Sequence, residues 1–224
     1  MMLGFWAAAL PVAALLGFPW TFLTGRVDFL YRMAMWGAWT GVRLTGVQVE
    51  TVGLDRIDPR RSYIFMCNHV SNIDPPIVIP AVPKRTSVLV KKEVFRIPVL
   101  ATAMRMGQLV PVDRTDRDSA ITSLKRAEDV LALGVNMTVF PEGTRSNTGE
   151  MLPFKKGPFY MALEAGVPVL PMTILGTRAI WPKGSMAIKP GTATVVFHSP
   201  IHPNNFPDRE ALMEAVRTSI ASVM

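Results

Sequence analysis

The chain of 224 residues is nearly without cysteine, since Cys67 is the single one. A lone cysteine excludes an intrachain disulfide framework and a cysteine-rich zinc site. Histidine is also scarce, and His69, His198 and His202 are not grouped with further ligands as a hydrolytic zinc site requires, so we expect no metal. Charged residues make up only 18% of the chain against 49% apolar residues, which excludes a disordered protein. The length allows one or two domains with a buried core.

Charge is absent from residues 1–25, and residues 3–23 are almost entirely apolar. A run of about 20 apolar residues is long enough to span a bilayer. Pro11 and Pro19 each remove a backbone donor, so a bent span and a re-entrant helical hairpin both remain open. The run lacks the preceding basic residues and the small-residue cleavage site of a signal peptide. The alternative is a buried core helix, which needs a large protein around it.

A second helix is predicted over residues 28–45, where large apolar residues recur at helical spacing. Trp36 and Trp39, together with nearby arginines, suit a lipid headgroup interface as well as an ordinary protein surface. Because the basic residues follow the apolar run, the positive-inside rule places the rest of the chain on the cytoplasmic side. We expect residues 1–45 to form a helical membrane-anchoring segment and residues 46–224 to form an α/β domain.

The rest of the chain alternates between strand-like and helix-like segments. Strands are predicted at residues 47–52, 62–67, 86–90, 109–112, 135–140, 167–175 and 192–198. Helices are predicted at residues 74–80, 91–106, 116–133, 158–165 and 208–223, with a long polar loop at 141–157. This alternation predicts an α/β fold, with a mixed sheet flanked by helices and an N-terminal helical membrane anchor.

His69 and Asp74 follow the apolar strand predicted at residues 62–67. Five positions separate them by about 140° on a helix and place them on opposite faces of a strand, so only a turn can bring them together. In such a turn Asp74 would accept the Nδ1 proton of His69 and leave Nε2 free to take a proton from a hydroxyl. The alternative is a capping aspartate and a solvated histidine. Cys67 as a nucleophile is disfavoured by its apolar neighbours, and Ser71 lacks the G-x-S-x-G turn of hydrolases.

A second polar segment, residues 140–146, follows another apolar strand. Gly143 allows the backbone to approach a ligand closely, and Arg145 carries a planar fork suited to phosphate. The segment is not a P-loop, because the G-x-x-x-x-G-K pattern is missing. The alternative is a solvated loop with a salt bridge.

The net charge of +7 predicts a negatively charged partner. Basic residues gather in residues 84–105 and again at Lys155 and Lys156. They fit a phosphate site, a lipid-facing patch or a solvated face. We do not expect nucleic acid as the partner, because no helix-turn-helix, zinc finger or aromatic RNA-binding signature is present.

Four ordered segments resemble the motifs of glycerolipid acyltransferases, in particular those of the 1-acyl-glycerol-3-phosphate acyltransferase family. They are residues 68–75 (N-H-x4-D-P), 107–114 (GQLVPVDR), 140–146 (FPEGTRS) and 167–172 (VPVLPM). Residues 91–98 also resemble the family sequence between the first two motifs. The resemblance covers about residues 60 to 175, and four motifs in order make it specific.

This resemblance implies a membrane-bound enzyme that acylates the sn-2 hydroxyl of lysophosphatidic acid. The donor would be acyl-CoA or acyl-carrier protein, with direct transfer, no covalent acyl-enzyme and no cofactor. His69 would be the general base and Asp74 would orient it. Glycerol phosphate would be bound by Glu142, Gly143, Thr144 and Arg145, with Lys92, Arg105 and Arg114 as further contacts or supports.

The expected location is a membrane, the bacterial inner membrane, with the catalytic domain on its cytoplasmic face. Within the same family, the alternative is another lysolipid acceptor, such as an ornithine-lipid precursor. The alternative of a different class is a non-catalytic membrane protein that binds lipid, and an acyl-transfer assay separates the two.

Overall fold

The computed structural model describes residues 2–113 and 116–224. Among these residues, seven strands form one sheet in the order β1-β7-β6-β2-β5-β3-β4. The strands are β1 (Val47–Val52), β2 (Ile64–Cys67), β3 (Thr86–Lys91), β4 (Val110–Val112), β5 (Asn136–Val139), β6 (Val169–Leu175) and β7 (Gly191–Phe197). Neighbouring strands are parallel except β6 and β7, which are antiparallel. The predicted α/β fold with a mixed sheet is confirmed.

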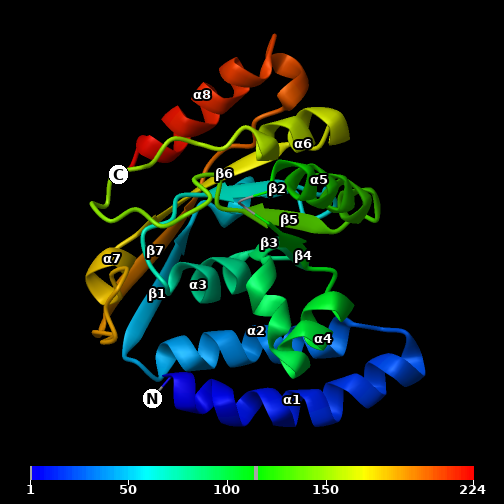
Figure 1. The fold of residues 1–224 in the computed structure, drawn as a ribbon. Coiled ribbons are helices and arrows are strands. Elements are labelled where there is room, and N and C mark those ends of the chain that lie inside the picture. The colour runs from blue at the N-terminus through cyan, green and yellow to red at the C-terminus, as the bar shows by residue number, and fades with distance from the viewer. Residues whose placement is uncertain (1, 114–115) are drawn as a thin grey trace.

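The helices flank this sheet (Figure 1). They are α1 (Met2–Thr24), α2 (Asp28–Arg43), α3 (Asp74–Ala81), α4 (Pro98–Met106), α5 (Arg117–Ala132), α6 (Gly157–Ala165), α7 (Thr177–Ile180) and α8 (Arg209–Ala221), with 3-10 turns η1 (Leu54–Arg56), η2 (Lys92–Arg96) and η3 (Pro203–Asn205). The helix predicted over residues 91–106 is divided into η2 and α4. Ile97 is extended between them, as the residue before a proline usually is. Helix α7 was not predicted, because four residues are too few to show a helical period.

The central strands are buried on both faces, as the alternation along β2 shows. Phe65 and Cys67 belong to the core on one face, with side chains from α2 and α3. Ile64 and Met66 belong to the core on the other face, with side chains from α5, α6 and α8. A parallel strand covered on both sides has a continuous apolar sequence, which is why β2 could be recognised.

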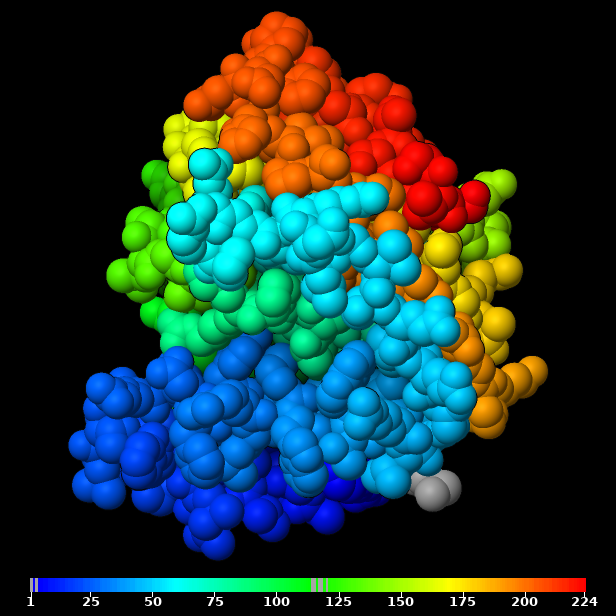
Figure 2. All heavy atoms as spheres, turned by 180° about the vertical axis from the view of Figure 1, so that it is seen from behind, coloured from blue at the N-terminus to red at the C-terminus, as the bar shows by residue number. Residues whose placement is uncertain are grey.

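Helices α1 and α2 form an antiparallel pair at one end of the molecule, opposite α8 (Figures 1 and 2). Of the bent span and the re-entrant hairpin, the structure excludes a hairpin within this segment, because α1 runs as one helix through both prolines. The pair packs closely because Gly17 has no side chain: a Cβ there would lie 2.6 Å from Leu30 Cδ1. Helix α2 is in turn tied to the sheet, since the Thr86 N–H donates to Tyr31 Oη (3.2 Å).

Helix α1 is long and apolar enough to cross a membrane, and it is the one such helix in the part of the chain described. Its window over Gly4–Thr24 has a mean hydropathy of 1.6, and only 6% of that window is buried in the protein. A core helix would be mostly buried, so the core-helix alternative is wrong. Helix α1 could therefore anchor the protein to a membrane.

Candidate active site

The two predicted motif loops leave the same edge of the sheet from neighbouring strands. Strands β2 and β5 are parallel, with Met66 opposite Val139. His69 and Glu142 each lie three positions beyond this pair, so both loops begin side by side at the carboxyl ends of their strands. Open α/β sheets bind ligands at this edge.

His69 and Asp74 are hydrogen-bonded through Nδ1 and Oδ2, which are 2.8 Å apart. The turn between them also directs the backbone N–H groups of Val70 (2.8 Å) and Ser71 (2.7 Å) to the same carboxylate oxygen. The alternative of a capping aspartate is wrong, because Asp74 is the first residue of α3, Ile73 is the cap residue, and no side chain makes a capping hydrogen bond. Its fully buried carboxylate instead turns back to hold the histidine.

An aromatic ring also holds the imidazole of His69, by stacking on its face. Its plane stacks on Phe140, with ring centroids 4.2 Å apart and an angle of 27° between the planes. The side chain is 11% exposed, and no hydrogen bond to Nε2 is found within residues 2–113 and 116–224. Nδ1 is occupied by Asp74, so Nε2 is the ring nitrogen that has no protein partner among these residues.

Glu142 holds the two loops together through both of its carboxylate oxygens. Oε1 accepts the backbone N–H of His69 (2.7 Å), and Oε2 accepts the backbone N–H of Leu152 (2.7 Å). Burial raises the pKa of Glu142, and nearby Asp74 adds to this, while the two amide hydrogen bonds and Arg217 oppose it. The structure therefore places this predicted substrate-binding residue where it supports the backbone of His69.

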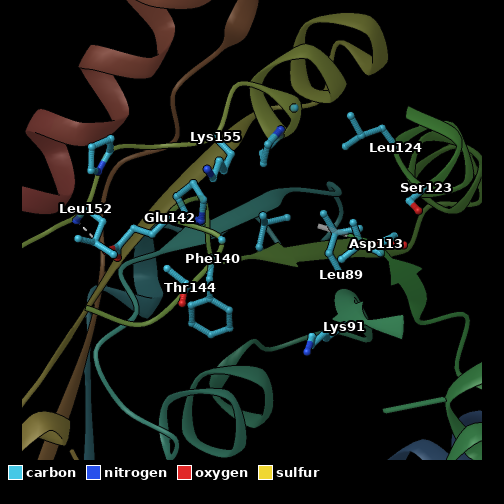
Figure 3. Close-up of a pocket in the computed structure, with 17 residues that line it drawn as sticks. Leu89, Lys91, Asp113, Ser123, Leu124, Phe140, Glu142, Thr144, Leu152 and Lys155 are labelled. Atoms are coloured by element: carbon cyan, nitrogen blue, oxygen red, sulfur yellow. Dashed lines mark hydrogen bonds between the residues drawn. The ribbon is translucent and has the colours of Figure 1, made fainter. Parts of the chain in front are cut away.

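A cavity of about 700 Å³ opens beside this site (Figure 3). Its walls come from the carboxyl ends of β3, β4 and β5, from the 141–156 loop, and from α5 and the start of α6. Phe140, which stacks on His69, is part of the lining, and so are the predicted residues Glu142, Gly143 and Thr144. His69 itself does not line the cavity; it adjoins the cavity through its contacts with the lining residues Phe140 and Glu142. The cavity has the size of a small-molecule site.

Two lysines that line this cavity, Lys91 and Lys155, were not among the predicted site residues. Gly143 has a φ of +70°, and a Cβ on it would lie 3.2 Å from Lys155 Cγ, so the lysine methylenes rest on the glycine backbone. The available signal was the two Lys-Lys pairs in the sequence. Which lysine of each pair enters the cavity depends on the local turn of the chain.

Three other predicted phosphate contacts, Arg145, Lys92 and Arg105, are not among the residues that line the cavity. Arg145 is half-buried and does not line the cavity. Its backbone carbonyl accepts a hydrogen bond from Lys183 Nζ (3.1 Å). Lys92 pairs with Asp113, a lining residue, and this partner raises the pKa of the lysine. Arg105 is exposed and lies over the ring of Phe95 (5.9 Å). Arg114 lies outside the described residues.

The nucleophile alternatives receive no support from the site. Burial raises the pKa of the Cys67 thiol well above its usual range, and the Asp74 and Glu142 carboxylates add to this, so the thiolate is disfavoured. The Ser71 hydroxyl donates to the carbonyl of Trp181 (2.5 Å). No group of three or more His, Cys, Asp or Glu side chains able to hold a metal ion occurs among the described residues.

Fold and site together are those of an α/β domain in which a His–Asp pair adjoins a cavity at the sheet edge. The sequence model of the acyltransferase family matches residues 48–175, more than half of the chain. The chain therefore belongs to the acyltransferase family, and the family resemblance predicted from the four motifs is confirmed.

Several relatives within this family are named 1-acyl-sn-glycerol-3-phosphate acyltransferases. The protein of Cocos nucifera is 33% identical over 86% of this chain and 61% of its own length. The protein of Limnanthes alba is 34% identical over 84% of this chain and 66% of its own length. This chain thus spans less than two thirds of the length of these curated relatives.

A solved structure supports the fold over nearly the whole chain. The crystal structure of the 1-acyl-sn-glycerophosphate (LPA) acyltransferase PlsC from Thermotoga maritima superposes with a TM-score of 0.84 at 28% identity. The match covers 99% of this chain and 92% of that one, so it includes the α1–α2 pair as well as the sheet.

Proposed function

We propose that this protein transfers a fatty acyl group from acyl-CoA or acyl-carrier protein to the sn-2 hydroxyl of lysophosphatidic acid, which yields phosphatidic acid. The observation that carries the proposal is the 2.8 Å hydrogen bond between His69 Nδ1 and the buried Asp74 carboxylate beside the cavity. The names of the curated relatives support the choice of reaction and acceptor.

In this mechanism, His69 Nε2 takes the proton of the sn-2 hydroxyl while the oxygen attacks the thioester carbonyl. Asp74 keeps the other ring nitrogen protonated and stabilises the imidazolium that forms. The tetrahedral intermediate collapses, the C–S bond breaks, and the thiolate takes the proton back from His69. One O–C bond replaces one C–S bond, so the proposal needs neither a covalent acyl-enzyme nor a cofactor.

Both substrates are anionic, and we propose that the 141–156 loop binds the acceptor. Gly143 and Thr144 line the cavity, and Arg145 follows directly, where a guanidinium can reach phosphate with two parallel hydrogen bonds. Glu142 supports this loop by accepting the backbone N–H of Leu152. Lys92, Arg105 and Arg114 serve as further phosphate contacts or hold that site.

We propose that α1 anchors the protein in a membrane and that the α/β domain lies on the cytoplasmic face, as at a bacterial inner membrane. The apolar and largely exposed α1 supports the anchor. The arginines that follow α1 in the sequence support the orientation.

The test is product analysis with the purified full chain in detergent, offered lysophosphatidic acid, an ornithine-lipid precursor and other lysolipids with each donor type. Phosphatidic acid as the main product is expected. A different acylated lipid as the main product would show that the acceptor is another lysolipid, while the proposed acyl-transfer chemistry would stand. Lipid binding without turnover would identify the non-catalytic alternative.

Two histidine variants make this assay specific for the proposed base. His69→Ala is expected to remove product formation, whereas His202→Ala, at an exposed histidine, is expected to retain it. Equal activity of the two variants would contradict the mechanism.

A further inference from the structure

Arg217 on α8 fastens the 141–156 loop from outside the segment that matches the family. Its Nη1 donates to the Leu152 carbonyl (2.9 Å) and its Nη2 to the Met151 carbonyl (3.1 Å). The guanidinium also lies over the ring of Phe154, with Cζ 5.4 Å from the centroid. Three neighbouring residues of the loop are therefore held by one half-buried side chain.

The same stretch of loop is hydrogen-bonded to the proposed base through Glu142. Leu152 is held from both sides. Its carbonyl accepts from Arg217, and its N–H donates to Glu142 Oε2 (2.7 Å), as Figure 3 shows. The other oxygen, Oε1, accepts the backbone N–H of His69 (2.7 Å). A continuous series of hydrogen bonds thus runs from α8 to the backbone of His69.

Helix α8 is a rigid support for this series. Leu212, Val216 and Ile220 recur every four residues and are fully buried against the sheet. The hydroxyl of Thr173 on β6 donates to the Ile220 carbonyl (2.8 Å), which fixes the end of the helix. Arg217 follows directly after buried Val216, so the helix holds it in a fixed place relative to β6.

We infer that Arg217 is a positioning residue for the acyl transfer: by fixing the 141–156 loop, it allows Glu142 to hold His69 in its reactive place. The inference rests on the proposed function. A loop of this length without regular structure loses much conformational entropy when it is ordered, so a side chain that binds two of its carbonyls has a clear role. A small misplacement of a catalytic group lowers the rate strongly.

The test compares Arg217→Met with Arg217→Lys in the full chain. The methionine keeps much of the volume and loses both hydrogen bonds, whereas the lysine keeps the charge and can reach one carbonyl. We expect Arg217→Met to lower kcat about tenfold with KM for both substrates within about twofold, and the lysine variant to fall between it and the parent. Arg209→Met is the matched control, because Arg209 lies on the same helix over Tyr160 of α6 (4.4 Å) and pairs with Glu210, and within the described residues no hydrogen bond from it to a carbonyl of this loop is found.

A double-mutant cycle with Glu142→Gln separates positioning from a general loss of stability. Glutamine has a single acceptor oxygen, so it cannot serve both amides as the carboxylate does. If Arg217 acts through Glu142, Arg217→Met costs less than about twofold in kcat once Glu142→Gln is present. The inference would be overturned if the fold-loss of kcat in the double variant equalled the product of the losses in the two single variants. It would also be overturned by parent-like kcat in folded Arg217→Met.

The pH profile gives a readout that a purely structural role would not move. The groups around Glu142 are Asp74 from α3, the Cys67 thiol from β2, His69, and Arg217 from α8, with Lys155 lining the same cavity. Arg217 lowers the pKa of Glu142, so its removal lets the carboxyl take a proton at higher pH. The acidic limb of kcat is expected to move to higher pH in Arg217→Met and to stay in place in Arg209→Met.

A measurement without turnover distinguishes failure of this inference from failure of the proposed function. The chain has three histidines, so their ring signals can be followed by NMR and assigned with His69→Ala. Arg217→Met is expected to shift the His69 signal and to leave that of exposed His202 unchanged. A parent protein without acyl transfer would contradict the function alone, whereas an unshifted His69 signal would contradict the positioning role.

Discussion

Helix α1 and strand β2 are both almost purely apolar, yet they place their side chains in opposite surroundings. All four residues of β2 are buried between helices on the two faces of the sheet. On α1, by contrast, Leu15 and Phe22 are more than 70% exposed and Leu23 is 87% exposed. Apolar composition alone therefore does not tell whether a segment belongs to a protein core. The number of faces that the rest of the chain covers decides it.

This difference suggests separate roles for the α1–α2 pair and the α/β domain. The domain carries the His–Asp pair at its sheet edge, and its core is completed on one face by Val42 from α2. The helix pair packs on one side of the domain and leaves large apolar side chains uncovered, a pattern typical of a membrane-contacting surface. Separate changes in the two regions are therefore expected to have separate effects, and the predictions below test this from the largest effect to the smallest.

The largest effect is expected in the α/β domain. His69→Ala removes the proposed base, and kcat is expected to fall by about 10²–10⁴-fold. Folding, followed by circular dichroism, and binding to vesicles, followed by flotation, are expected to stay at the level of the parent. Near-parent kcat in the folded variant would contradict the role of His69, and lost vesicle binding would contradict the division between the regions.

The second effect is expected in the helix pair. Deleting residues 1–25 removes an apolar helix with no charged side chain, so vesicle binding is expected to weaken by about 10²-fold or more, because even a few large apolar side chains contribute over ~3 kcal/mol of transfer free energy. Trp36 on α2 remains exposed, so some binding is expected to persist.

The same deletion tests whether the α/β domain depends on α1. Activity is expected to fall most with acceptor in bilayers and least with acceptor in mixed detergent micelles. An unfolded truncated protein, or equal loss in both assays, would show that α1 is part of the folding unit.

The strands and the two motif loops could be predicted from the sequence because their signals are local. The apolar run of β2 stops at Cys67, and the turn residues that follow allow His69 and Asp74 to meet. The role of Arg217 has no such signal, since its partners are backbone carbonyls 65 and 66 positions away, and any residue type supplies a carbonyl. The same holds for Glu142, whose motif predicted a ligand contact although its oxygens bind two backbone amides.

The third effect concerns recognition of the acceptor in the 141–156 loop. Arg145→Lys is expected to lower kcat/KM for the lysolipid about tenfold, because an ammonium group cannot form the bidentate contact of a guanidinium and about 1.4 kcal/mol is lost. Arg178→Lys is the control, since Arg178 is exposed and donates to the nearby Asn147 carbonyl (3.1 Å). A loss confined to the acyl donor would contradict the proposed role of this loop.

A smaller effect is expected at the lysine that the structure adds to the cavity. Lys155→Met is expected to lower kcat/KM about threefold to fivefold, because it removes one positive charge from the lining while the methionine can still cover Gly143. Lys156→Met is the matched control: its ammonium group points elsewhere and pairs with Glu210 (3.7 Å). Equal losses in the two variants would show that general charge matters more than position in the cavity.

The smallest effect is a pH dependence of stability at His198 in the α/β domain, to which α1 contributes no titratable side chain. Burial lowers the pKa of His198 below its ordinary 6.5, and Arg56 adds to this. Thr173 donates its hydroxyl proton to the Ile220 carbonyl, so His198 Nε2 has to donate to Thr173 Oγ1 (2.8 Å), which fixes one tautomer of the imidazole.

As pH falls below 6.5, the unfolded chain takes up a proton at His198 before the folded protein does, so stability is lost until the lower folded pKa is reached. Thermal unfolding across this window is expected to show a shallower loss of Tm in His198→Gln, which keeps an N–H donor but does not titrate. The chain without residues 1–25 is expected to keep the parent's slope. An unchanged slope in His198→Gln would contradict the assignment. A flattened slope in the truncated chain would show that α1 alters the packing of α8 on the sheet, and the division between the two regions would then fail.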